Sequence, residues 1–416
     1  MPMHINAERL KANTIALSEI GGQPNGGVTR LAYSIQEKQA REWVAARFQE
    51  CGLPVRLDAA GNLFAHLGGR FPSPVVMTGS HVDTVPNGGR FDGAAGTLAA
   101  LEVANTLCQA RFKPIYSIEF VVFAAEESRR FKAGNRFGSR ALVGQVGPAD
   151  AERLVDENGV TLAQAMRSLE LDPALLPTAQ QSHGDIKAFV ELHIEQGTEL
   201  QALGIPVGVV TRVTGTRRYQ IEVRGRADHS GGTQMHARQD ALAAAAQIIL
   251  EIERAANEIG GSLVETVTTV SVEPNAMNIV PGKVVLGVDI RDIHGDALDR
   301  ATRALFETVD SVAQQRGVAT TITVLRETAP IELAPHLWDV MREAGARAGI
   351  PTALVPSHTG HDAISMSAIM DAGMIFVRNP GGQSHSPAEC VEWDDLALAA
   401  QLLLETIVSL AENVHA

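Results

Sequence analysis

Residues 74–93 read PVVMTGSHVDTVPNGGRFDG, and a segment with helical spacing, TLAALEVANTLCQA, follows at 97–110. The apolar run PVVM predicts a buried strand, the run rich in Gly and Pro predicts a loop, and the third segment predicts a helix. His81, Asp83 and Asp92 bring three groups that can bind metal into this short unit. Open α/β sheets bind ligands at the carboxyl ends of their strands, so the unit indicates an α/β fold with a site near His81.

Apolar strand-like runs and helical segments alternate in the segments on either side of this unit. Residues 35–52 have helical spacing and end at Gly52, and residues 54–69 suggest a hairpin. Further strands are predicted in YSIEFVVFAAEE (116–127), AFVELHIEQG (188–197) and MIFVRNP (374–380). This alternation predicts a mostly parallel sheet that is covered by helices on both faces.

The pattern changes near residue 213, where longer strands and two long amphipathic helices begin. Their order is βαββαβ, which forms a complete small α/β sandwich, and the two middle strands flank a Pro-Gly turn. We therefore predict a domain inserted into the first one. The expected segments are a catalytic domain over 1–212 and 329–416 and an inserted lid and dimerisation domain over 213–328.

Composition limits the class of protein and its partners. The 416 residues are too many for one ordinary core and suggest two domains. A net charge of −13 disfavours nucleic acid and anionic membranes and favours a small soluble substrate. Three cysteines without a CxxC motif argue against disulfide scaffolding and thiolate metal sites. The chain shows neither a signal peptide nor an apolar run of about 18 residues, so we predict a cytoplasmic protein.

Polar groups recur at the ends of the predicted strands. Taken singly, a His there is more often structural, an adjacent Glu pair is usually a solvated helix start, and a Gly-rich loop can be a turn or an anion nest. Their recurrence in one layer favours a metal site with nitrogen and oxygen ligands, suited to Zn²⁺, Mn²⁺, Co²⁺ or Ni²⁺. Six groups are too many for one closed site and fit two metals with an additional catalytic carboxylate. The six are His81, Asp92, Glu126, Glu127, His193 and His385.

Five strings together resemble the amidase/hydantoinase/carbamoylase family: GSHVDTVPNGGRFDG, FAAEES, ELHIEQG, VEPNAMNIVPG and GGQSHSPAE. That family includes N-carbamoyl-L-amino-acid hydrolases, allantoate amidohydrolases and β-ureidopropionases. It belongs to the larger clan of dinuclear aminoacylases and carboxypeptidases. The resemblance covers nearly the whole chain.

The resemblance implies a role for each member of the cluster. His81 and His193 would hold one metal, Glu127 and His385 the other, and Asp92 would bridge the two. Glu126 would be the general base and Asp83 would orient His81. A cis peptide bond between Asp92 and Gly93 would also follow from this likeness. The residues implied for substrate binding are Gln196, His229, Asn278, Arg291 and Gly360.

The implied reaction is metal-dependent hydrolysis of the carbamoyl group of an N-carbamoyl-L-amino acid. Allantoate amidohydrolase is the nearest alternative, a peptidase or aminoacylase is more distant, and a non-catalytic ureide- or metal-binding protein is a remote one. The clan also implies a homodimer formed through the inserted domain, to which the apolar helix face of ALAAAAQIIL (241–250) would contribute. The chain departs from the family pattern at three places: Gln234 in HSGGTQM, HTGHD at 358–362, and EESRRF at 126–131. The first two lie close to the implied substrate contacts and so affect the substrate expected, whereas none removes an implied metal ligand.

Overall fold

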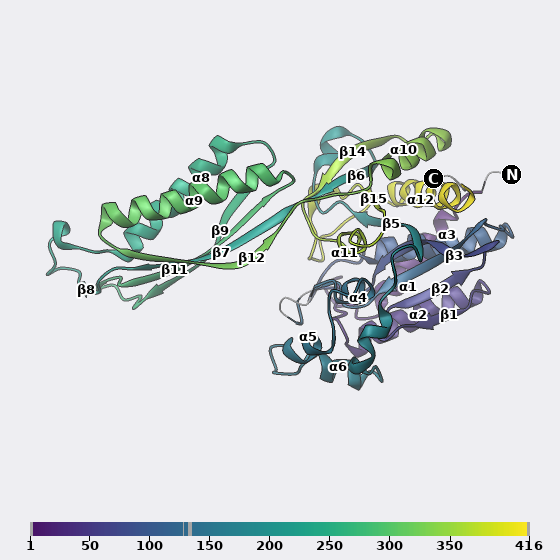
Figure 1. Cartoon of the computed structure of the whole chain (residues 1–416), viewed down its shortest axis with the longest axis horizontal. Coiled ribbons are helices and arrows are strands. Elements are labelled where there is room, and N and C mark those ends of the chain that lie inside the picture. The colour runs from purple at the N-terminus through teal and green to yellow at the C-terminus, as the bar shows by residue number, and fades with distance from the viewer. Residues whose placement is uncertain (1–2, 128, 132–134, 414–416) are drawn as a thin grey trace. The chain divides into compact units, whose positions relative to one another are not determined.

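The computed structural model describes residues 3–127, 129–131 and 135–413, and the chain divides into two compact units (Figure 1). The first unit contains the residues up to Thr211, Glu332–Val355 and the residues from Thr359 on. The second contains Arg212–Ile331 together with Pro356–His358, and so overlaps the predicted insertion over 213–328.

A nine-stranded sheet forms the centre of the first unit, and its four middle strands β4, β3, β5 and β15 run parallel. The flanking pairs β1–β2, β2–β4 and β15–β6 are antiparallel. The prediction of a largely parallel sheet is confirmed. In order across the sheet the strands are β1 (Val55–Leu57), β2 (Leu63–Leu67), β4 (Tyr116–Phe123), β3 (Phe71–His81), β5 (Ile186–Ile194), β15 (Ala372–Val377), β6 (Val207–Val213) and β13 (Ile331–Glu332), with β14 (Thr352–Ser357) beside β6.

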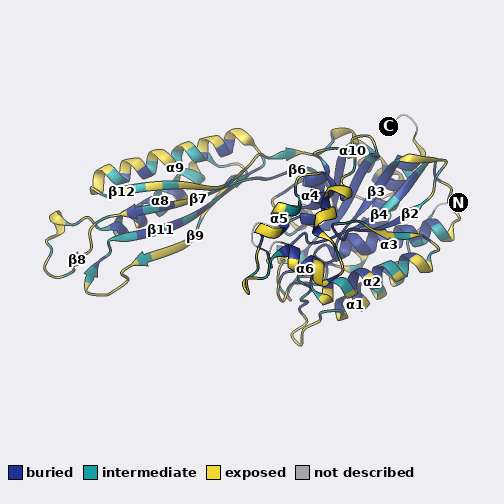
Figure 2. Ribbon diagram, turned by 60° about the horizontal axis from the view of Figure 1, so that its bottom comes forward, coloured by how far each residue is buried: buried dark blue, intermediate teal, exposed yellow. Residues whose placement is uncertain are grey.

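Helices cover this sheet because its middle strands are apolar on both faces, as parallel strands usually are. Every residue of β15 is buried, and Figure 2 shows the strands as a buried layer whose covering helices expose their outer sides. One core joins the sheet to α1 (Ala7–Glu19), α2 (Ile35–Glu50), α3 (Ala94–Gln109), α10 (Pro335–Ala348) and α12 (Trp393–Glu412). A second apolar cluster joins α4 (Phe137–Leu142), α5 (Pro148–Arg153), α6 (Leu162–Ser168) and η1 (Pro173–Ala179). The remaining short helices of this unit are α7 (Glu199–Leu203), α11 (Asp362–Met366) and η3 (Pro380–Gly382).

The second unit is an antiparallel sheet in the order β12-β7-β11-β9 that packs against α8 and α9. A ribbon of two short strands, β8 and β10, continues beyond the end of β11 at Lys283. The predicted order of strands and helices is present. The elements are β7 (Gly215–Arg224), β8 (Asp228–His229), η2 (Met235–Ala237), α8 (Ala241–Ile259), β9 (Val264–Glu273), β10 (Ile279–Val280), β11 (Lys283–Asp292), α9 (Gly295–Arg316) and β12 (Ala319–Thr328).

The apolar face of α8 is used inside its own unit. Ala244, Ala245, Ile248 and Ile252 are buried against the sheet, whereas Leu250 is 65% exposed. The Ala- and Ile-rich face of this helix is therefore not available for pairing with a second chain.

Within the described part of the chain, no helix is both long and apolar enough to cross a membrane. The three cysteines, Cys51, Cys108 and Cys390, are free thiols.

Candidate metal centre

The loop between β3 and α3 has its glycines where other groups need the space. Gly93 has φ +62°, and a Cβ there would lie 2.3 Å from Cε1 of His81. A Cβ on Gly89 would lie 2.1 Å from the carboxyl carbon of Glu389. No larger residue fits at these two positions, and the loop can therefore turn Asp92 back toward the end of β3.

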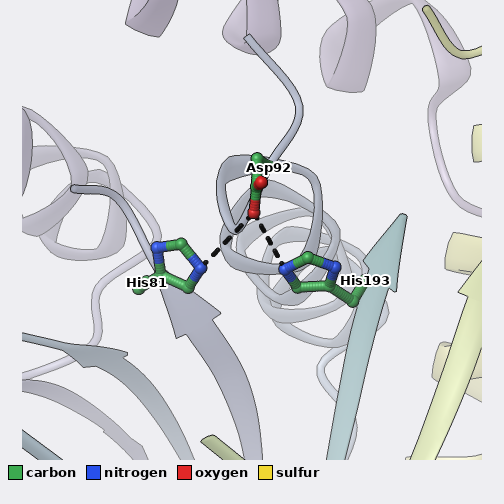
Figure 3. Close-up of side chains that lie close together, drawn as sticks. All are labelled: His81, Asp92 and His193. Atoms are coloured by element: carbon green, nitrogen blue, oxygen red, sulfur yellow. Dashed lines mark ion pairs between the residues drawn. The ribbon is translucent and has the colours of Figure 1, made fainter. Parts of the chain in front are cut away.

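His81, Asp92 and His193 form the first group of candidate ligands, and all three are buried (Figure 3). His81 ends β3 and His193 lies near the end of β5, so the parallel strands bring both rings to the same edge of the sheet. Oδ1 of Asp92 lies 3.2 Å from Nε2 of His193 and 3.7 Å from Nε2 of His81. Both rings point toward this one oxygen.

Asp92, Glu127 and His385 form the second group. Nε2 of His385 lies 3.3 Å from Oδ2 of Asp92 and 3.3 Å from Oε1 of Glu127. The side chain of His385 is 43% exposed, so this half of the centre is open to solvent. The two carboxylate oxygens of Asp92 thus face two different groups, which is the geometry that a bridging ligand requires.

The surroundings of the cluster shift the pKa values of its carboxyl groups in opposite directions. Burial disfavours the ionised form of Asp92, but hydrogen bonds with His193 and His385 outweigh it and hold its pKa well below the ordinary value. Burial raises the pKa of Glu127, and it raises the pKa of Glu126 well above the usual range. A divalent cation at the centre would reverse this tendency and favour the ionised carboxylates. Buried imidazole and carboxylate groups without a thiolate suit such a cation.

Asp83 contacts a member of each ligand group, His81 of the first and Glu127 of the second. Its carboxylate accepts hydrogen bonds from the backbone N–H groups of Glu126, at 3.1 Å, and Glu127, at 2.9 Å. Nδ1 of His81 lies 3.0 Å from the main-chain oxygen of Asp83 and 3.5 Å from its carboxylate. The resemblance implied only that Asp83 orients His81. Its hydrogen bonds to the backbone of Glu126 and Glu127 form because the end of β4 lies beside Asp83. The sequence pattern does not show that contact.

Gln196, which the resemblance implies for substrate binding, is engaged with the cluster itself. Its Nε2 donates to Oδ2 of Asp92 at 2.8 Å and to the Ser384 hydroxyl at 3.1 Å. Its Oε1 accepts from the Thr359 hydroxyl at 2.7 Å. Gly360, also implied for substrate, directly follows Thr359 in the first unit.

The second unit holds the other implied substrate residues at two separate places. His229 on β8 lies beside Asn278, whose main-chain oxygen accepts from the N–H of Ser230 at 3.0 Å. Nδ1 of His229 accepts from the N–H groups of Gly231 and Gly232 at 3.1 and 3.0 Å, so the proton of the neutral ring is on Nε2.

Arg291 lies near the opposite end of β11, where it pairs with Thr216 of β7. Its Nε donates to Oδ1 of Asp289 at 2.7 Å, and its Nη2 lies 3.3 Å from Oδ2. Arg291 lies eight positions along β11 from Lys283, which is next to the β8–β10 ribbon. Eight steps correspond to about 26 Å of extended chain. One small molecule therefore cannot contact both Arg291 and His229 of the same chain.

One structural expectation is wrong and one lies outside the described residues. The cis peptide bonds of the described chain are Ser73–Pro74 and Glu273–Pro274, and the bond between Asp92 and Gly93 is not among them. The positive φ of Gly93 makes the turn instead. Ser128, part of the EESRRF departure, lies outside the described residues.

Comparison with known proteins identifies the class. The profile of Peptidase family M20/M25/M40 matches residues 77–409. An N-carbamoyl-L-amino acid amidohydrolase of Geobacillus stearothermophilus is 41% identical over 98% of this chain and 100% of its own. An allantoate amidohydrolase of Bacillus subtilis is 34% identical over 95% of each chain. The crystal structure of an amidase of the hydantoinase/carbamoylase family from Burkholderia multivorans superposes with a TM-score of 0.91 at 31% identity, over 99% of each chain.

The fold, the site and these relatives define a metal-dependent amidohydrolase that acts on C–N amide bonds. The chain belongs to Peptidase family M20/M25/M40, and the resemblance to hydantoinase/carbamoylase amidases is confirmed. Family membership and the His/Asp/Glu cluster together indicate that it binds divalent metal.

Proposed function

We propose that this protein hydrolyses N-carbamoyl-L-amino acids to the amino acid, ammonia and carbon dioxide, using two divalent metal ions. His81, Asp92 and His193 would hold one ion, and Asp92, Glu127 and His385 the other. The observation that carries the proposal is the position of Asp92, whose two oxygens face two separate ligand groups. Zinc suits both groups, and manganese, cobalt or nickel are alternatives. The carbamoyl substrate follows from the Geobacillus relative, which matches 98% of the chain.

The residues around the centre suit each step of this hydrolysis. When bound, the ions would lower the pKa of a water molecule and polarise the carbamoyl carbonyl. Glu126 would accept the proton of the attacking water and return it to the leaving nitrogen as the C–N bond breaks. Its carboxylate is buried and lies 3.9 Å from Nε2 of His81, and Asp83 fixes the backbone from which it extends. These contacts support Glu126 as the base of the proposed reaction.

The second unit supplies groups for the rest of the substrate. His229 carries its proton on Nε2 and can donate it in a hydrogen bond to the oxyanion that forms on the carbamoyl oxygen. Nε and Nη2 of Arg291 donate to Asp289, and Nη1 donates to the main-chain oxygen of His358 at 3.4 Å. Each Nη nitrogen carries a second hydrogen, and these two would bind a substrate carboxylate. A planar guanidinium suits that group better than an ammonium does.

We further propose that the protein acts as a homodimer in which one subunit contributes His229 and Asn278 to the centre of the other. The separation of about 26 Å between Arg291 and the β8–β10 ribbon supports a shared centre. Arg291 and His229 of one chain are too far apart to bind the same small substrate. Since the Ala- and Ile-rich face of α8 covers its own sheet, the contact would use other surfaces. The unpaired edges of the sheet are candidates, with Val270 on β9 and Val324 and Leu325 on β12 more than half exposed.

The substrate is tested by measuring ammonia release from a panel of ureides and amides. We expect the highest kcat/KM with N-carbamoyl-L-methionine and less with N-carbamoyl-β-alanine, allantoate, ureidoglycolate and N-acetyl-L-methionine. A preference for allantoate would support the second candidate, which the 34% identical Bacillus relative favours. If the metal-loaded protein turns over none of these compounds, both candidate functions are rejected.

We place the protein in the cytoplasm, which its three free cysteines favour.

A further inference from the structure

Glu389 is a buried carboxylate, 6% exposed, that points at the loop carrying Asp92. Its Oε1 accepts hydrogen bonds from the backbone N–H groups of Phe91, at 2.7 Å, and Asp92, at 3.0 Å. Its Oε2 accepts from the Ser384 hydroxyl at 3.1 Å. One carboxylate therefore joins two chain segments that lie almost 300 residues apart in the sequence.

Both segments carry candidate metal ligands. Ser384 directly precedes His385, and its hydroxyl also lies 2.8 Å from Oδ2 of Asp92. His385 has a φ of +57°, a backbone conformation that a residue with a side chain adopts only when its surroundings hold it there. Glu389 thus contacts the main chain of the bridging ligand and the neighbour of the ligand that completes the second group.

The glycine loop is shaped to admit this carboxylate. A Cβ on Gly89 would lie 2.1 Å from both the carboxyl carbon and Oε1 of Glu389. The second glycine of PNGGRFDG is therefore required by the position of Glu389, a residue without a role in the proposed mechanism.

We propose that Glu389 is a positioning residue of the metal centre: its acceptor oxygens fix the main chain of Asp92 and, through Ser384, the loop of His385. This rests on the two-metal centre proposed above but not on the identity of the substrate. Removing the acceptors leaves two buried N–H groups of the bridge loop without partners, so Asp92 loses its fixed position toward both ions. Groups that orient metal ligands in this way typically contribute about 10- to 100-fold to metal affinity.

The test measures Zn²⁺ affinity of the full-length, metal-depleted protein by competition with a chelating indicator, without substrate. We expect Glu389→Ala to weaken binding of both ions by about tenfold or more. Glu389→Gln keeps an oxygen that can accept from both N–H groups and should restore most of the affinity. Because turnover is not measured, failure of the proposed carbamoylase activity would leave the result unaffected.

Asp240→Ala is the matched control, because one oxygen of Asp240 also accepts from two backbone N–H groups, those of Leu242 and Ala243, but in the second unit. This variant should bind Zn²⁺ as the wild type does. Should Glu389→Ala not fold, Gly89→Ala provides a second route, because its methyl group displaces the Glu389 carboxylate and should cause the same loss. The proposal is overturned if Glu389→Ala, or Gly89→Ala in its place, keeps the wild-type affinity for Zn²⁺ or loses no more of it than Asp240→Ala does. It is also overturned if Glu389→Gln binds Zn²⁺ as weakly as Glu389→Ala.

Discussion

Arg291 donates from Nε to Oδ1 of Asp289 at 2.7 Å, and the two residues extend from the same face of β11. Asp289 also accepts from Nε of Arg218 on β7 at 2.7 Å, so one carboxylate lies between two guanidinium groups. This pairing holds the pKa of Asp289 below its ordinary value even though burial opposes it. Asp289 therefore orients the Arg291 guanidinium, whose remaining hydrogens are the proposed anchor for a substrate carboxylate.

Replacing Arg291 by Lys should raise KM for an N-carbamoyl amino acid by about tenfold or more, because an ammonium cannot make two parallel hydrogen bonds to a carboxylate. The carboxamide analogue of the substrate should show little change. Arg218→Lys is the matched control, since it alters the same ion-pair cluster without removing the proposed anchor. If Arg291→Lys leaves the preference for the carboxylate unchanged, Arg291 is not the anchor.

Light scattering should give the mass of a dimer at micromolar concentration. Mixing the inactive variants His229→Ala and Glu126→Gln should restore part of the activity, because a mixed dimer has one centre with both an intact Glu126 and the partner's intact His229. Mixing two batches of the same variant is the control. A monomeric mass, or mixtures no more active than either variant alone, would exclude shared centres.

Glu265 on β9 should make the stability of the second unit depend on pH. Burial raises its pKa to about 8, and its Oε1 has no hydrogen-bond partner among the described residues. Between pH 4.5 and 8 the unfolded chain loses this proton while the folded chain keeps it, so the free energy of unfolding falls as pH rises through that window. Glu265→Gln should thus raise the melting temperature at pH 8 more than at pH 4.5. Equal shifts at both pH values would show that Glu265 does not titrate in this way.

Asp92→Ala should lower the metal content of both sites together, because one carboxylate serves both ligand groups. Metal analysis after dialysis measures this directly. Full occupancy of either site in the variant would contradict a bridging role.

The sequence was sufficient to predict the parallel strands and the candidate ligands, because both follow from short-range patterns. His81, His193 and the Glu126–Glu127 pair each lie near the end of an apolar run, and the carboxyl ends of parallel strands meet at one edge of the sheet. Glu389 was harder to assign: it lies within a motif, GGQSHSPAE, but its partners Phe91 and Asp92 are distant in sequence. Nor could the apolar pattern of α8 distinguish packing on its own sheet from packing on a second chain. Periodicity shows which face of a helix is apolar and not what covers it.

The most direct test of the central claim is the kcat of Glu126→Gln on an N-carbamoyl-L-amino acid, measured together with its metal content. A carboxamide cannot accept the proton of the attacking water, whereas the proposed ligands are unchanged. We predict wild-type metal content and a kcat lower by about 10²- to 10⁴-fold. A variant that retains its metals and more than about a tenth of the wild-type kcat would contradict the assignment of Glu126 as the general base.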